Sequence, residues 1–173
     1  MLGHDALTRL QEAAVLWSVG EATPADVIEA ACDCLVADVD SPSLRILAGV
    51  SSAPSSDSEQ LRRWLEDALG ELSLTYYRKG SREGEDEAVR IMARRVLART
   101  ITPRYLTSWA YLCITTEGTP LAGELINLDN TYECVEAGVH DGQEYPTAAA
   151  AKVDADVIAE ARRLVGGRTA ENA

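Results

Sequence analysis

Phenylalanine is absent from this 173-residue chain, and aromatic residues make up only 5% of it. Strands favour aromatic and β-branched residues, whereas Ala and Leu, which dominate the apolar set here, favour helices. The composition therefore predicts an all-α fold, an irregular bundle of about seven or eight helices. The one alternative is a short strand near residues 111–116, where the sequence reads YLCITT.

Long apolar runs are also missing. No stretch approaches the roughly 18 apolar residues that cross a bilayer, and the N-terminus lacks a basic segment followed by an apolar one. We therefore expect no membrane contact. A cytoplasmic location, where the four cysteines would stay reduced, is the expectation.

Residues that usually carry cofactors or catalysis are few. Cys32 and Cys34 would point about 200° apart on a helix, and there is no C-x-x-C pair, so no metal site is predicted. The chain has no G-x-x-x-x-G-K loop for phosphate. His140 beside Asp141 could form a general base with its orienting carboxylate, but neighbouring loop residues seldom have that geometry. We predict no catalytic residue and no cofactor.

Basic residues are outnumbered, with 16 against 28 acidic ones and a net charge of −12. Residues 1–60 carry a net −8, residues 61–104 a net +3 and residues 105–173 a net −7. This charge serves solubility and internal ion pairing, and it favours a basic protein over nucleic acid as a partner. A helix-turn-helix with Arg104, Tyr105 and Thr107 in a major groove is the nucleic-acid alternative.

Four Ser/Thr-Pro pairs mark predicted helix starts. A Ser or Thr side chain accepts a hydrogen bond from a first-turn amide, and Pro lacks the N–H that would go unpaired. The pairs begin at Thr23, Ser41, Thr102 and Thr119. Apolar residues recur at helical spacing after each pair. We predict one helical domain over residues 1–165, with a flexible C-terminal tail over residues 166–173.

Three carboxylates share one flank of the helix predicted after Pro120. Asp129, Glu133 and Glu136 follow at i, i+4 and i+7, within about 60° of arc, while Cys134 points elsewhere. Like charges on successive turns destabilise a helix unless a nearby cation compensates them. The cation could be Arg104 or an arginine of the preceding helix, a group on a basic partner protein, or a divalent metal. Asp129, Glu133 and Glu136 are thus the predicted partner-binding residues.

These observations favour a non-catalytic acidic module that binds a basic protein, as an immunity-like or antitoxin-like protein or an adaptor would. No motif identifies one family. The alternatives are a small helical enzyme or metal-binding protein that uses the helix carboxylates with His140, and the helix-turn-helix regulator. The sequence does not define the oligomeric state.

Overall fold

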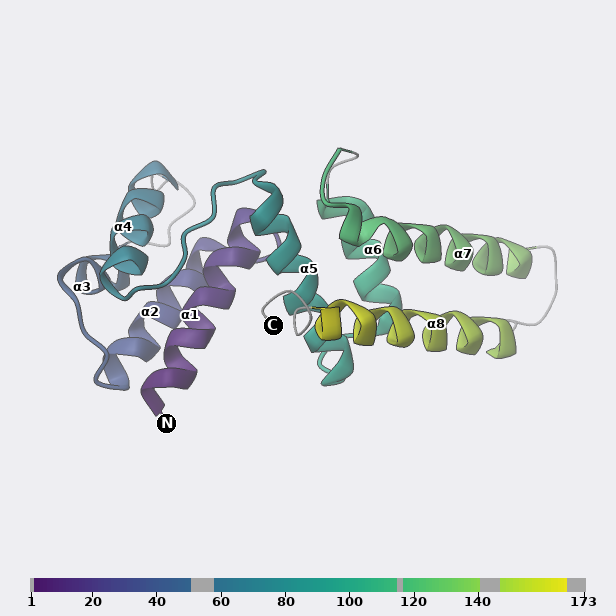
Figure 1. Cartoon of the computed structure of the whole chain (residues 1–173), viewed down its shortest axis with the longest axis horizontal. Helices are drawn as coiled ribbons and strands as arrows, with labels where there is room; N and C mark the ends of the chain where they lie inside the picture. The colour runs from purple at the N-terminus through teal and green to yellow at the C-terminus, as the bar shows by residue number, and fades with distance from the viewer. Residues whose placement is uncertain (1, 51–57, 115–116, 141–146, 168–173) are drawn as a thin grey trace. The chain divides into compact units, whose positions relative to one another are not determined.

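A computed structural model describes residues 2–50, 58–114, 117–140 and 147–167 of the chain. Within these ranges the regular elements are eight α-helices and one short 3-10 helix, and no strand is present (Figure 1). The all-α prediction is therefore confirmed. The alternative of a strand near 111–116 is wrong for residues 111–113, which end a helix, whereas residues 115 and 116 lie outside the described ranges.

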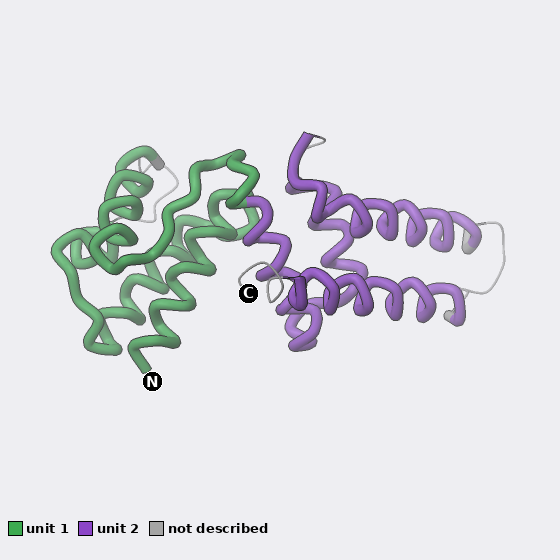
Figure 2. Tube along the Cα trace, in the orientation of Figure 1, with its two compact units in different colours: residues 1–84 green, residues 85–173 purple. Residues whose placement is uncertain are grey.

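The chain divides into two compact units, residues 1–84 and residues 85–173 (Figure 2). The division follows contacts within the chain. It does not test whether residues 1–165 fold as one domain, which stays a prediction. Of the predicted tail, Gly166 ends the last helix, and residues 168–173 lie outside the described ranges.

Unit 1 is built from four helices, and each helix packs against the next one along the chain. Their bounds are α1 (Leu2–Ser18), α2 (Pro24–Val36), α3 (Pro42–Ala48) and α4 (Ser58–Glu71). The core is made of Leu, Ala and Val side chains together with Cys34, which is fully buried. Burial raises the pKa of the Cys34 thiol, which keeps it protonated.

Unit 2 contains three helices packed on one another and a further helix that starts in the last residues of unit 1. The bounds are α5 (Arg82–Leu97), α6 (Pro103–Cys113), the 3-10 helix η1 (Pro120–Ala122), α7 (Gly123–His140) and α8 (Thr147–Gly166). α6 contacts both α7 and α8, and α7 contacts α8. The inward face of α8 is apolar and buried, and it consists of Val153, Val157, Ala161 and Leu164.

All four Ser/Thr-Pro pairs begin helices, and each Ser or Thr side chain accepts a hydrogen bond from a backbone amide of the first turn. At Thr119 the first turn is a 3-10 helix, and α7 itself starts at Gly123. α7 continues through Gly138 to His140. A glycine inside a helix costs only about 1 kcal/mol, which neighbouring turns can offset.

Candidate functional site

The first turn of α6 presents Arg104 to α7. Thr102 caps this helix by accepting a hydrogen bond from the amide of Tyr105 at 3.1 Å, and Pro103 fills the first position. Leu106 and Trp109 are buried on the inward face, which fixes the rotation of the helix. Arg104 is therefore held at the edge of the packed face, where its side chain reaches the flank of α7.

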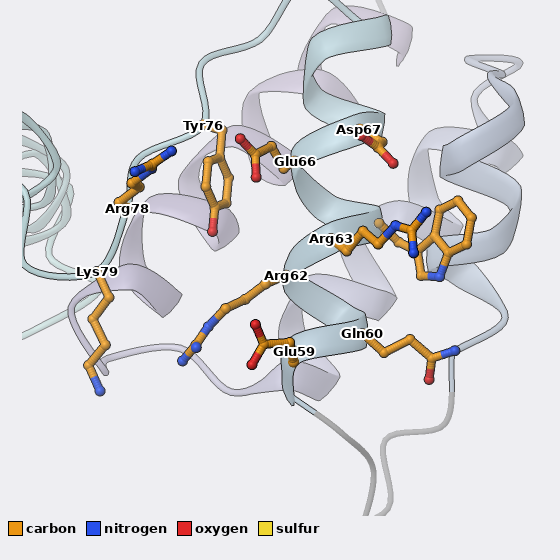
Figure 3. A pocket seen from close by; sticks show the side chains of 10 residues that line it. Glu59, Gln60, Arg62, Arg63, Glu66, Asp67, Tyr76, Arg78 and Lys79 are labelled. Atoms are coloured by element: carbon orange, nitrogen blue, oxygen red, sulfur yellow. The ribbon is translucent and has the colours of Figure 1, made fainter.

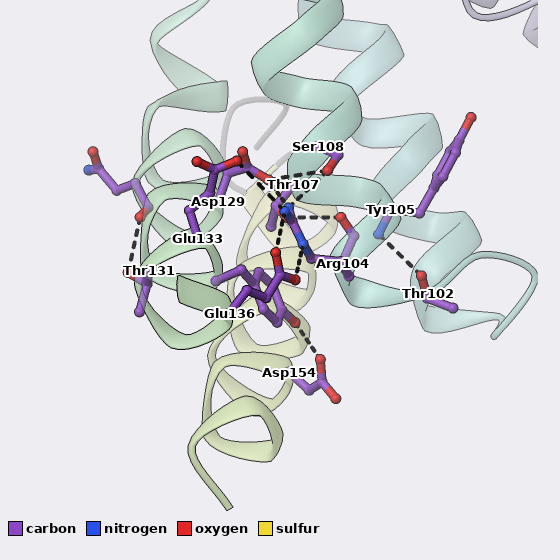
Figure 4. A network of polar contacts seen from close by, with 12 residues as sticks. Thr102, Arg104, Tyr105, Thr107, Ser108, Asp129, Thr131, Glu133, Glu136 and Asp154 are labelled. Atoms are coloured by element: carbon purple, nitrogen blue, oxygen red, sulfur yellow. Dashed lines mark hydrogen bonds and ion pairs between the residues drawn. The ribbon is translucent and has the colours of Figure 1, made fainter. Parts of the chain in front are cut away.

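Arg104 binds the predicted carboxylates of α7 (Figure 4). Its Nε and Nη2 donate to the two carboxylate oxygens of Glu136 at 2.8 and 3.1 Å. Its Nη1 donates to Oδ1 of Asp129 and to Oγ of Ser108. Its Nη2 lies 4.0 Å from Oε1 of Glu133. The structure therefore brings all three predicted site residues together around one guanidinium, which we call the Arg104 cluster.

The three carboxylates differ in their exposure. Asp129 is only 3% exposed and depends on Arg104 and Ser108 for its hydrogen bonds. The side chain of Glu136 is 40% exposed, and that of Glu133 is 69% exposed. Asp129 is thus an internal anchor, whereas Glu133 and Glu136 face solvent. Whether a partner binds them is not tested by this geometry and stays a prediction.

The hydrogen bond with Glu136 raises the pKa of Arg104 above its ordinary value, burial acts in the opposite sense, and the nearby charges of Asp129 and Glu136 add to the rise. The guanidinium therefore stays charged. Among the described residues it is the one cation within 4 Å of Asp129, Glu133 or Glu136. The Arg104 cluster consequently keeps an excess of negative charge.

A cavity of about 380 Å³ adjoins the Arg104 cluster. It is lined by Arg104, Glu136 and Tyr132, by Asp154 and Ala150 of α8, and by the start of α6. The hydroxyl of Tyr132 donates a hydrogen bond to Asp154, and the Arg104 guanidinium lies 5.2 Å from the centre of the Tyr132 ring. Tyr132 and Asp154 are residues that sequence reasoning missed, because their link joins α7 to α8 and has no local spacing signal.

Other candidates for chemistry stand apart from the Arg104 cluster. Cys134 and Cys32 are both exposed. His140 is the last residue of α7, and its side chain and Asp141 lie outside the described part of the chain. Within the described ranges, no group of three or more His, Cys, Asp or Glu side chains is placed to hold a metal ion. None of the described helices combines the length and apolarity needed to cross a membrane.

The residues of the predicted helix-turn-helix do not form one exposed face. Thr107 is fully buried, and its hydroxyl donates to the carbonyl of Arg104 at 3.0 Å. Arg104 is turned to α7, which leaves only Tyr105 of the three substantially exposed. Thr107 is therefore not accessible to a groove in this structure, and the helix-turn-helix alternative stays an untested prediction.

Comparison of the chain with protein-family models, with curated proteins and with solved structures found no match. The class defined by fold and site is thus an all-α protein with a carboxylate-rich cluster beside a cavity.

Proposed function

We propose that the protein is a binding protein without catalytic activity, which engages a basic protein through the Arg104 cluster and the adjoining cavity. The observation that supports it most directly is the local charge balance. Asp129, Glu133 and Glu136 gather about a single guanidinium, and Asp154 lines the cavity beside it. A cationic side chain of a partner would compensate this excess.

The exposure of the carboxylates suits this role. Glu133 makes only a long contact with Arg104 and keeps most of its surface in water, so a partner's Lys or Arg can pair with it without displacing an internal bond. The chain's net charge of −12 adds long-range attraction for a basic protein. Such attraction raises association rates and weakens with salt. Immunity-like, antitoxin-like and adaptor proteins all fall within this proposal.

A charge-reversal experiment tests the proposal. Tagged wild-type protein, Glu133→Lys and Asp156→Lys are used to capture proteins from an extract of the source cells at low salt. Both positions are exposed on helices of unit 2, and both substitutions change the charge equally, but only Glu133 belongs to the Arg104 cluster. Replacing Asp129 is avoided, because it would leave Arg104 without its buried partner.

We expect a basic protein that is retained by the wild type and by Asp156→Lys, is lost with Glu133→Lys, and elutes as salt is raised. Equal capture by all three proteins, or equal loss with both variants, would overturn the proposal, because binding would then be independent of this site or would reflect net charge alone.

A further inference from the structure

A second cavity lies wholly within unit 1, in a region that has no part in the proposed function. It has a volume of about 160 Å³ and is bordered by the end of α1, by α4 and by the segment that follows α4. Its walls include three aromatic residues and two cations: Trp17, Tyr76, Tyr77, Arg62 and Lys79. No carboxylate lines it, although the chain as a whole is strongly acidic.

Backbone contacts hold the aromatic wall in place. The side-chain amide of Gln11 in α1 donates to the carbonyl of Thr75 and accepts from its N–H, both at 2.8 Å. The amide of Leu74 also bonds to the carbonyl of Leu69 at the end of α4 at 2.8 Å. These bonds dock the segment on α1 directly before Tyr76 and Tyr77. The wall is therefore positioned by the fold.

Trp17 and Gly20, from the end of α1 and the turn that follows it, both line the cavity. Gly20 has a φ of +82°, a conformation that side-chain-bearing residues rarely adopt, so the turn that carries the chain away from Trp17 requires glycine. The guanidinium of Arg62 lies 5.7 Å from the centre of the Trp17 ring.

The two cationic side chains and the two tyrosines that line the cavity are groups that bind anions. Arg62 and Lys79 are both exposed and line this cavity. Figure 3 shows the neighbouring larger groove, whose lining also includes Arg62, Lys79 and Tyr76. Burial, followed by the charge of Glu66, raises the pKa of Tyr76, so the phenol stays neutral. The wall of this cavity thus carries two cations and no carboxylate, which suits a group of about two negative charges, as a phosphate monoester carries near neutral pH.

The size and wider charge of the region favour a small ligand over a polyanion. A cavity of about 150 Å³ in another protein holds one benzene ring. The larger groove next to this cavity shares Arg62, Tyr76 and Lys79 with it but also exposes Glu59, Glu66 and Asp67. Residues 1–84 carry 7 basic and 14 acidic side chains. This net negative charge would repel the phosphates of a long nucleic acid that extended beyond the cavity.

We infer that the unit 1 cavity binds a small phosphate monoester carrying one aromatic ring, with the ring against Trp17 and Tyr76 and the phosphate on Arg62 and Lys79. An aryl phosphate and a pyrimidine nucleoside monophosphate share this chemistry. The ring stacks on aromatic faces, and the phosphate accepts charge-assisted hydrogen bonds.

The test is a titration of the whole protein followed by the indole N–H signals of its three tryptophans in NMR spectra. Trp17 is assigned with a Trp17→Tyr variant, and Trp109, which is buried in unit 2, serves as the internal reference. The probes are phenyl phosphate and uridine monophosphate, with phenol and inorganic phosphate as the partial ligands. We expect phenyl phosphate or uridine monophosphate to move the Trp17 signal and to leave that of Trp109 in place. Which of the two binds more tightly identifies the source of the ligand.

The matched variants are Arg62→Gln and Lys79→Gln, with Arg63→Gln as the control. Arg63 is also exposed on α4, but it stacks on Trp64 at 5.5 Å and does not line the cavity. Each of the first two substitutions should weaken binding about five- to tenfold, since each removes a charged hydrogen-bond donor, whereas Arg63→Gln should leave it within about twofold. Three results would each overturn the inference: no response to either ring phosphate at millimolar concentration, equally tight binding of phenol or inorganic phosphate, or equal weakening by Arg63→Gln.

Discussion

Arg104 and Asp129 form an ion pair between α6 and α7, in which the Asp129 side chain is 5% exposed and that of Arg104 is 31% exposed. Burial makes the pair sensitive to the loss of either partner, because the remaining charge has little water to solvate it. The exposed Glu133, on the same flank, does not share this constraint. Stability and partner binding can therefore be separated within the Arg104 cluster.

Asp129→Asn should lower the free energy of unfolding by about 1–2 kcal/mol. Removal of one member of a fully buried pair costs about 3–5 kcal/mol, and the smaller figure applies here because Arg104 is partly exposed and keeps Glu136. Glu133→Gln is the control and should change stability by less than about 0.5 kcal/mol. Urea unfolding followed by far-UV circular dichroism measures both. Similar losses in the two variants would show that Asp129 has no special role.

The sequence predicted the flank but not its counterion, for a physical reason. Helical spacing fixes which residues of one helix share a side, so Asp129, Glu133 and Glu136 could be grouped from their numbers alone. The cation comes from α6, about 25 residues away in the chain, and its selection among several arginines depends on tertiary packing. In the preceding helix, Arg90 and Arg94 pair instead with Glu87 of that same helix.

The helix starts were likewise predicted from local signals in the sequence. A Ser/Thr-Pro pair acts within one turn, so its effect survives in any tertiary setting. The start of α5 shows the opposite case. The helix begins at Arg82 with no Ser/Thr-Pro pair before it, and the buried Glu85 accepts a hydrogen bond from the amide of Thr119, 34 residues away in the chain, at 2.8 Å. The unit 1 cavity likewise depends on the distant Gln11–Thr75 contact.

Thr23→Ala should destabilise the protein by about 1 kcal/mol, because it removes a capping box at the start of α2. The Thr23 side chain accepts from the amide of Asp26, and the Asp26 carboxylate accepts from the amide of Thr23 at 2.6 Å. Thr8→Ala, in the middle of α1, should be neutral or slightly stabilising, because Ala is the better helix former. Thermal unfolding of the two variants distinguishes these outcomes, and an unchanged midpoint for Thr23→Ala would contradict the capping role.

Glu71 should contribute a pH-dependent part of the stability of unit 1. Hydrogen bonds from Ser41 and from the side chain and amide of Ser43 lower the pKa of Glu71 below its ordinary value of 4.5. Because the folded pKa is the lower one, this stabilisation is fully present above the unfolded pKa and is lost as the pH falls through the folded pKa. Glu71→Gln should therefore reduce the loss of stability between about pH 6 and about pH 3.

The control for the pH experiment is Glu66→Gln, an exposed position on the same helix that no hydrogen bond joins to α3 in the described structure. Urea midpoints of the wild type and both variants are compared across the pH range. An equal reduction of the acid sensitivity by Glu66→Gln would assign the effect to overall charge rather than to the serine contacts.

Gly84→Ala and Gly70→Ala should change stability in opposite directions. Both glycines lie in helices with no positive φ, where Ala is favoured by about 1 kcal/mol. At Gly70 no atom lies within 4 Å of the added Cβ, so the full gain should appear. At Gly84 the Cβ would stand 2.8 Å from Oγ of Ser81 and 3.0 Å from Cβ of Tyr77.

The clash at Gly84 cannot be relieved at little cost. The Ser81 hydroxyl accepts a hydrogen bond from the Gly84 amide at 3.2 Å, so its displacement would break the cap of α5. The Cβ of Tyr77 is fixed to a backbone that is docked on α1 next to the unit 1 cavity. We expect a net loss of about 1–2 kcal/mol for Gly84→Ala, within the range of overpacked sites, measured by urea unfolding. A gain in stability equal to that of Gly70→Ala would mean that the segment carrying Tyr77 moves easily to make room for the added Cβ. It would also weaken the case for a preformed cavity.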